Sequence, residues 1–296
     1  MKKINLIYWN EKNFGDLLNP WLIDKLTPCE IQYKKFEASR KKRYLEYISS
    51  ILKLDFIKAK EVIMPWQKTF ICIGSIVRWS NFNTKVWGAG FMNDHESFWG
   101  GKIYAVRGRY TYSKLKKAGW ECPEVFGDPA LLLPIVFKNN ILKTKKIGII
   151  PHWKEVDFFI NEYGTKYSVI DFRTDKIEKT IEKINECEYI LSSSLHGLIV
   201  AHAYNIPAIW IKKGYIDTDG FKFKDYFSSV DIKEYDGFEN FDLILKSLDT
   251  IEDFFYKNKN ISLIQNSLLK IQKDLLKSYP FTLKNDYSNY LEEINN

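Results

Sequence analysis

Short apolar runs alternate with longer segments of helical periodicity along this chain. A strand, a glycine-bearing turn and a helix, as in residues 4–26, are the usual start of an open α/β sheet. Up to the charged stretch at residues 138–146, apolar runs predict strands at residues 4–9, 31–36, 69–75, 85–87 and 103–106. Amphipathic spacing or a capped start predicts helices at residues 17–26, 44–57, 111–117 and 127–134.

The charged stretch at residues 138–146 is a candidate linker, and the same alternation resumes after it. Apolar runs predict strands at residues 147–151, 167–171, 188–192 and 208–211, and helical spacing predicts helices at residues 154–163, 176–186 and 195–204. This alternation is typical of a parallel sheet with helices on both faces. An apolar stripe at residues 260–278 predicts a long helix that packs on the body, with a partner helix or a membrane as alternatives. We therefore expect α/β domains at residues 1–140 and 141–250, followed by a C-terminal helical segment at 251–296.

Composition favours a soluble, well-packed protein. The 296 residues are 45% apolar and include 20 Phe, 18 Tyr and 9 Trp, enough for a large core, which argues against disorder. No segment has the pattern of a signal peptide or the length of a transmembrane span, so we expect a cytoplasmic protein. Scattered cysteines predict buried thiols in a reducing compartment rather than a disulfide framework or a zinc site: Cys29, Cys72, Cys122 and Cys187.

The formal charge of +7 indicates an anionic partner. Its densest cluster is at residues 40–43, followed by the apolar positions of residues 44–52. This pattern suits peripheral contact with an anionic membrane surface, and a solvated helix start is the alternative. No recognised binding motif accompanies the charge, so we do not expect nucleic acid to be the partner.

The most informative stretch is residues 188–204, where an apolar run leads through three serines to His196 and a helical pattern. The first amides of a helix lack internal partners and carry partial positive charge, so a phosphate or carboxylate fits there. A histidine beside such an anion can exchange a proton near neutral pH. The alternative is that Ser192 to Ser194 merely cap the helix and that His196 is a satisfied surface histidine.

Other candidates follow predicted strands. Asp16 comes after the first strand, although a helix N-cap would explain it equally well. Gly88 and Gly90 permit either close approach of a ligand or a tight turn. Arg107 and Arg109 follow another strand just before a helix, which suits an oxyanion, with a surface ion pair as the alternative.

Six motifs occur in a family-specific order: Asn13-Phe14-Gly15-Asp16, Ile73-Gly74-Ser75, Val86-Trp87-Gly88-Ala89-Gly90, Val106-Arg107-Gly108, Gly127-Asp128-Pro129 and Ser192-Ser193-Ser194-Leu195-His196-Gly197. Across roughly residues 4–230 the chain thereby resembles the polysaccharide pyruvyl transferase family, in the compact branch that decorates succinoglycan-type exopolysaccharides. The resemblance implies two Rossmann-like domains in a GT-B-like arrangement with a cleft between them. It also implies transfer of pyruvate from phosphoenolpyruvate onto two hydroxyls of one lipid-linked or nucleotide-linked sugar as a cyclic ketal.

This chemistry requires several donors and positive charge for the phosphate and carboxylate of the donor, and an acid for its methylene carbon. We expect no redox cofactor and no metal. His196 and Arg107 are the expected catalytic residues. The expected substrate-binding residues are Asn13, Gly15, Asp16, Gly88, Gly90, Arg109, His152, Ser193, Ser194 and Lys222, with Lys224 as a further candidate.

Two positions depart from the family's pattern. Many relatives have an arginine where this chain has Ser194, and relatives with the Ser-Ser-Leu-His form often have an aspartate where it has His202. One donor contact is therefore unassigned. Two alternatives stay open: a glycosyltransferase that uses a nucleotide sugar in the same cleft, and a catalytically inactive scaffold of a polysaccharide assembly complex.

Overall fold

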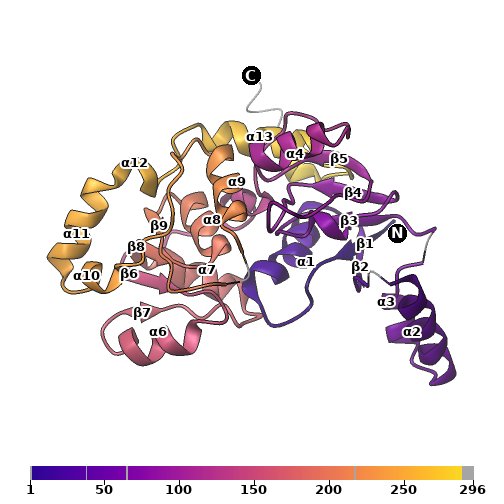
Figure 1. Ribbon diagram of the computed structural model, residues 1–296, viewed down its shortest axis with the longest axis horizontal. Helices are drawn as coiled ribbons and strands as arrows, with labels where there is room; N and C mark the ends of the chain where they lie inside the picture. The colour runs from indigo at the N-terminus through magenta and orange to yellow at the C-terminus, as the bar shows by residue number, and fades with distance from the viewer. Residues whose placement is uncertain (1, 38, 65, 217, 289–296) are drawn as a thin grey trace.

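The computed structural model describes residues 2–37, 39–64, 66–216 and 218–288, and it is a mixed α/β structure (Figure 1). Its strands form two separate parallel sheets. The strands are β1 (Lys3–Ile7), β2 (Glu30–Lys34), β3 (Thr69–Ile71), β4 (Thr84–Trp87), β5 (Lys102–Ala105), β6 (Lys145–Ile150), β7 (Ser168–Val169), β8 (Cys187–Ser192) and β9 (Ala208–Trp210).

The first sheet has the order β2-β1-β3-β4-β5, and the second has the order β7-β6-β8-β9. Both contain near-continuous apolar strands, such as β3, whose residues are all buried, as expected of parallel strands covered on two faces. The sheets lie on either side of the predicted linker at residues 138–146, although β6 already begins at Lys145. The parallel α/β class is therefore confirmed, while the domain boundaries stay a prediction.

The helices mostly follow the predicted pattern. They are α1 (Phe14–Leu26), α2 (Arg40–Leu52), α3 (Phe56–Glu61), α4 (Arg109–Lys117), α5 (Leu133–Val136), α6 (Val156–Tyr163), α7 (Ile177–Asn185), α8 (Leu195–Ala203), α9 (Phe221–Ser229), α10 (Phe241–Ile244), α11 (Leu248–Lys257), α12 (Lys259–Ser262) and α13 (Leu268–Ser278), with short 3₁₀ helices at Val77–Trp79 and Pro129–Leu132. Helix α1 begins three residues earlier than expected, because Asn13, not Asp16, accepts a hydrogen bond as its N-cap. Asp16 is therefore not the N-cap of α1, and its carboxyl does not cap the helix.

Two predicted helices are each broken in two. The helix expected at residues 44–57 is α2 and α3, separated by a turn in which Leu54 has a positive φ of 57°. The long helix expected at residues 260–278 is α12 and α13, because Ser267 accepts a hydrogen bond from Lys270 N and caps a new helix. In both cases the apolar stripe continues across the break, so periodicity alone did not reveal it.

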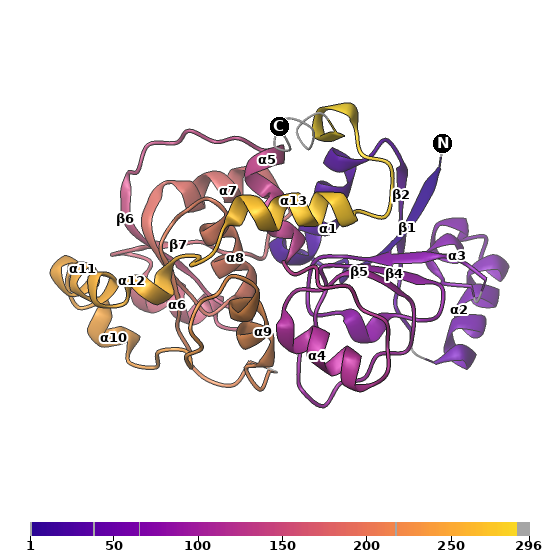
Figure 2. The ribbon, with the colours of Figure 1, turned by 90° about the horizontal axis from the view of Figure 1, so that it is seen from above.

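Helix α13 belongs to the end of the chain but packs on the first sheet (Figure 2). Trp87 Nε1 of β4 donates to Leu275 O over 3.0 Å, and Gln272 Nε2 donates to Leu131 O over 2.7 Å. These two hydrogen bonds attach α13 to β4 and to the short helix at Pro129–Leu132. Residues 289–296 of the predicted C-terminal segment lie outside the described residues.

The cysteines are less uniformly buried than expected. Cys72 and Cys187 are buried, whereas Cys29 and Cys122 are only partly buried, which corrects the expectation of four buried thiols. Within the described residues, no helix is long and apolar enough to cross a membrane.

Candidate active site

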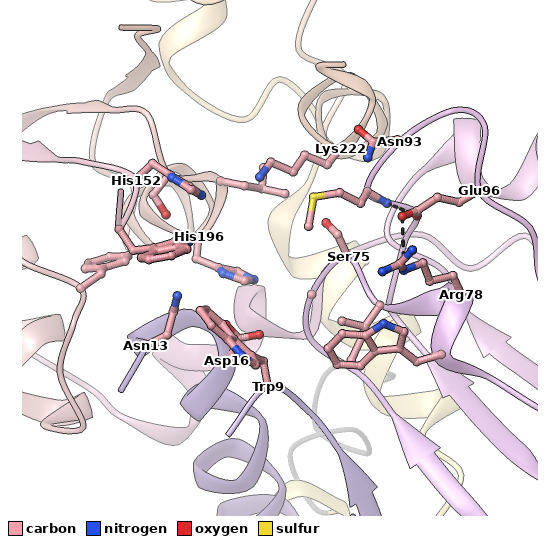
Figure 3. Close-up of a pocket in the computed structure, with 18 of the residues that line it drawn as sticks. Trp9, Asn13, Asp16, Ser75, Arg78, Asn93, Glu96, His152, His196 and Lys222 are labelled. Carbon is pink, nitrogen blue, oxygen red and sulfur yellow. Dashed lines mark hydrogen bonds and ion pairs between the residues drawn. The ribbon is translucent and has the colours of Figure 1, made fainter. Parts of the chain in front are cut away.

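A cavity of about 400 Å³ is lined by residues that come after strands of both sheets. Its walls include Trp9, His152 and Ser194, each two residues after β1, β6 and β8 respectively, and Ser75, four residues after β3. Ligands of open α/β sheets bind at such strand ends. Figure 3 shows His152 and His196 on one side of the cavity, Ser75, Arg78 and Glu96 on the other, Lys222 across the top, and Asp16 and Trp9 across the bottom.

His196 is held rigidly in this cavity. It lies in the first turn of α8, and a Cβ added to Gly15 would come within 1.9 Å of His196 Nδ1, so the ring packs directly on the Gly15 backbone. Its Nε2 is buried and has no hydrogen-bond partner within the described residues. Burial, with the positive charges of Lys222 and Arg107, lowers the pKa of His196 to about 3, so the imidazole is neutral in the free protein.

Asp16 has the opposite perturbation. Burial raises the pKa of its carboxyl to about 7, an effect that Lys222 partly offsets. Asn19 fixes this part of α1 to the end of β3, because its side chain accepts from Ile73 N and donates to Ile73 O. The Asp16 carboxyl lies near Gly74, where an added Cβ would be 4.0 Å from Oδ1. The cavity thus contains a carboxyl that holds a proton near neutral pH and a histidine that does not.

The cavity wall also carries a buried cation. Lys222, in the first turn of α9, is buried and lines the cavity, and its charge acts on both Asp16 and His196. The chain therefore supplies a positive charge and a helix N-terminus to one place, which favours an anionic ligand.

Arg107 lies behind the cavity wall with no exposed surface. Its Nε donates to Asp225 Oδ2 over 3.0 Å, Nη1 donates to Ser75 Oγ over 2.6 Å, and Nη2 donates to Phe91 O over 2.5 Å. All three guanidinium nitrogens are thus engaged, and the residue that reaches the cavity is Ser75. The expected direct contact between Arg107 and the donor stays a prediction.

The serines of the central motif divide their roles. Ser194 lines the cavity and occupies the N-cap position of α8, although its side chain makes no capping hydrogen bond. Ser193 is buried outside this cavity, where its hydroxyl donates to Glu155 and accepts from His152 N. His202 is likewise in the core, hydrogen-bonded to the Tyr226 hydroxyl and to Ala208 O, and does not line the cavity.

The remaining predicted residues fall into two groups. Asn13 and His152 line the cavity, as expected. Gly88, Gly90 and Arg109 do not line it. An added Cβ at Gly88 would meet Pro129 Cδ at 2.3 Å, and one at Gly90 would meet the Arg107 guanidinium at 2.6 Å, so both glycines serve internal packing here.

Two other predicted cations lie at the surface. Arg109 is exposed and donates to Ser228 O. Lys224 is 3.4 Å from Asp236 in a surface ion pair.

Several lining residues were not singled out from the sequence. Trp9 and Trp153 form an exposed aromatic wall, with ring centroids 5.7 Å apart and exposed fractions of 37% and 40%. At the other end, Glu96 accepts from Met92 N and lies 3.5 Å from Arg78 Nε. The available signal was that Trp9 ends one predicted strand and that Trp153 comes two residues after another. Within the described residues, no group of three or more His, Cys, Asp or Glu side chains is arranged to hold a metal ion.

Comparison with known proteins gives a family match over part of the chain. The model of the family described as polysaccharide pyruvyl transferase matches residues 101–212. The chain is 30% identical over 237 residues to "Uncharacterized protein L143" of Acanthamoeba polyphaga mimivirus, covering 75% of this chain and 82% of that protein. It is 26% identical over 234 residues to "Succinoglycan biosynthesis protein ExoV" of Rhizobium meliloti (strain 1021), covering 76% of this chain and 64% of that protein.

Proposed function

Since this chain belongs to the polysaccharide pyruvyl transferase family, we propose that it transfers pyruvate from phosphoenolpyruvate onto two hydroxyls of one saccharide as a cyclic ketal. The expected family and enzyme class are confirmed, and the family implies a saccharide acceptor. The donor, the ketal, a GT-B-like cleft between the two sheets and a cytoplasmic place of action belong to the proposal.

The observation that carries the proposal is the buried, unpaired Nε2 of His196 beside Lys222. Phosphoenolpyruvate has a phosphate and a carboxylate, so it needs positive charge and several hydrogen-bond donors. Lys222 supplies charge, and the first turn of α8 supplies backbone amides and the Ser194 hydroxyl. Asn13 and Ser75 add polar groups to the same cavity.

The low pKa of free His196 is compatible with a role as general acid in the donor complex. Returning that pKa from about 3 to its ordinary value of 6.5 requires roughly 5 kcal/mol. Two negative charges about 4 Å away contribute about 8 kcal/mol at an effective dielectric constant near 20. A dianionic phosphate beside His196 is therefore sufficient to protonate it, so the acid forms when the donor is bound.

Asp16 suits a different task. With a pKa of about 7 its carboxyl is partly protonated near neutral pH, and a bound anion raises that pKa further. A protonated carboxyl donates a hydrogen bond to the donor's carboxylate or phosphate, whereas an ionised one repels it. Asp16 thus binds the donor in its neutral form.

The proposed reaction begins at the methylene carbon of phosphoenolpyruvate. Imidazolium His196 transfers its proton to the methylene carbon, and one sugar hydroxyl adds to the adjacent carbon and returns its proton to His196. The bond between this carbon and the phosphate oxygen breaks, and phosphate leaves. The second hydroxyl then closes the ring, and its proton departs with the phosphate.

The acceptor side of the cavity is its aromatic wall. The ring faces of Trp9 and Trp153 are partly exposed, and aromatic faces carry partial negative charge that attracts the C–H groups of a sugar ring. Hydroxyl groups on the same sugar then face the polar cavity.

Thermal unfolding with added ligands tests the proposal. A ligand at 100 times its Kd stabilises the protein by about 2.7 kcal/mol, so phosphoenolpyruvate is expected to raise Tm. Stabilisation by a nucleotide sugar alone favours a glycosyltransferase. Response to neither ligand favours an inactive scaffold. Product analysis by NMR with a saccharide acceptor then shows whether a ketal forms.

A further inference from the structure

Helices α2 and α3 leave their large apolar side chains in solvent. Figure 1 shows the pair projecting from the rest of the molecule. In residues 41–61, only Ser50 and Ala59 are buried. The exposed fractions of the large apolar side chains range from 37% to 79%: Tyr44, Leu45, Ile48, Ile51, Leu52, Leu54, Phe56 and Ile57. Contiguous exposed apolar surface of this kind marks an interaction site.

The turn between the two helices is well ordered and places a leucine at an unfavourable position. Asp55 N donates to Ser50 O and Leu54 N donates to Ile51 O, which is a Schellman ending of α2. Leu54 occupies the left-handed position, with φ of 57°, where glycine or asparagine is favoured. Its side chain is nevertheless exposed at the tip. The local backbone therefore gives no reason for a leucine at position 54. A ligand that binds the leucine side chain would give one.

The charges around this apolar tip are predominantly positive. Its exposed lysines are Lys41, Lys42, Lys53, Lys58 and Lys60. The acidic groups of the segment are only partly exposed, and two are engaged: Glu46 pairs with Lys35 over 2.6 Å, and Asp55 caps α3 by accepting from Lys58 N. The tip thus combines exposed leucine, isoleucine and phenylalanine with a rim of lysines.

We propose that this helical pair docks on an anionic lipid bilayer. The apolar tip enters the interface between headgroups and acyl chains, and the lysine rim contacts lipid phosphates. A second copy of the chain is a poorer occupant, because a symmetric contact places the two lysine rims against each other. The charge of the rim therefore selects the bilayer.

The docking surface connects to the candidate active site. A second groove is lined by Arg43 of α2 together with the exposed Phe82 and Trp99, and also by Arg78 and Trp79, which line the active-site cavity as well. A saccharide anchored in the bilayer would reach the cavity along this groove. This connection rests on the proposed function, whereas the docking itself does not.

Co-sedimentation with vesicles tests docking without any measurement of enzyme activity. The protein is expected to pellet with vesicles of phosphatidylcholine and phosphatidylglycerol but not with phosphatidylcholine alone, and added salt should weaken the binding. The double variant Leu52→Asp/Ile57→Asp should lose more than about tenfold in partition coefficient. The matched control Leu142→Asp/Leu243→Asp changes two leucines with exposed fractions of 82% and 67% elsewhere and should bind normally.

Leu54→Gly separates docking from folding. Glycine is favoured at this backbone position, so Tm should be unchanged or higher while vesicle binding weakens. Equal vesicle binding by the wild type and the Leu52→Asp/Ile57→Asp variant would overturn the proposal. The proposal would also be overturned if the wild type were a dimer that does not bind vesicles and the Leu52→Asp/Ile57→Asp variant were a monomer. Light-scattering chromatography measures the oligomeric state of both proteins.

Discussion

Arg107 and Asp225 form an ion pair, with 3.0 Å between Nη2 and Oδ2, in which both side chains are fully buried. The arginine follows β5, and the aspartate lies in α9, in the other half of the chain. The Thr111 backbone and hydroxyl donate to the same carboxylate, so its oxygens are well satisfied. Arg107 also donates to Ser75, which lines the cavity. The ion pair therefore links the Ser75 hydroxyl to the contact between the two halves of the chain.

Asp225→Asn should lower the free energy of unfolding by about 3–5 kcal/mol, because it leaves a buried guanidinium without its counter-charge. Chemical denaturation measures this. Arg107→Lys keeps the charge but loses the planar fork, so it should destabilise less and also weaken donor binding through Ser75. The exposed Arg109, 3.6 Å from Asp231, is the control, and Arg109→Lys should cost less than about 1 kcal/mol. Wild-type stability in Asp225→Asn would contradict the argument.

His196→Gln should lower kcat by roughly two to four orders of magnitude while leaving donor affinity close to normal. Glutamine preserves hydrogen bonding but cannot carry the proton. Steady-state kinetics and calorimetric titration with phosphoenolpyruvate measure the two quantities separately. If affinity falls while turnover at saturation stays intact, His196 is a phosphate ligand and not the acid.

The raised pKa of Asp16 predicts that donor affinity depends on pH. Its pKa of about 7 in the free protein means that the carboxyl ionises as pH rises through neutrality, so donor affinity should fall above about pH 7. Asp16→Asn is permanently neutral and should flatten this part of the profile. A calorimetric series across pH measures it, and the same slope in both proteins would exclude the role.

The same group has a linked effect on stability. Between the unfolded pKa of 3.8 and the folded value of about 7, the folded protein holds a proton that the unfolded chain has lost. The contribution of Asp16 to the free energy of unfolding therefore decreases as pH rises through this window. Comparison of wild type and Asp16→Asn by denaturation at several pH values isolates that contribution.

Gly15→Ala should disable the site by displacing a ring. The added Cβ would lie 1.9 Å from His196 Nδ1, so the imidazole must move away from its position. Displacement by about 1 Å costs on the order of a hundredfold in rate. Gly214→Ala, where an added Cβ meets nothing within 4 Å, is the matched control and should retain activity. Full activity of Gly15→Ala would show that the position of His196 is not critical.

Trp153→Ala should raise KM for the saccharide acceptor and leave the Kd for phosphoenolpyruvate unchanged, because it removes one face of the aromatic wall. A comparable exposed residue, Trp66, does not line the cavity, so Trp66→Ala should change neither quantity. Initial-rate kinetics with varied acceptor measures the effect. An unchanged acceptor KM would place the sugar elsewhere.

The regular part of the fold was predictable because strands and helices impose their own periodicities. Residues in the turns and helix starts that come after strands, such as Asp16 and Ser194, could be placed near a site by the rule that ligands bind at strand ends. The turn at Leu54 could not, because leucine gives no turn signal and the apolar stripe runs on through it. Ser267, which caps α13, carried a signal that the continuous stripe concealed.

The partners of Arg107 were not predictable for a different reason. Asp225 is separated from it by more than a hundred residues, and no motif surrounds that aspartate. An arginine after a strand is equally suited to a ligand or to a buried carboxylate, and only the packing of α9 decides between them. Gly90 shows the same limit, since its missing Cβ makes room for the Arg107 guanidinium.

The position of α13 has a consequence for biosynthesis. Phe70 and Trp87 of the first sheet are covered by Tyr279 and Phe281, which follow α13. A ribosome makes the chain from its N-terminus, so this sheet emerges well before the segment that covers it. Its aromatic face is then available to chaperones or to misassembly until Tyr279 and Phe281 have been made. A chain truncated before Tyr279 should therefore leave this aromatic face of the first sheet uncovered.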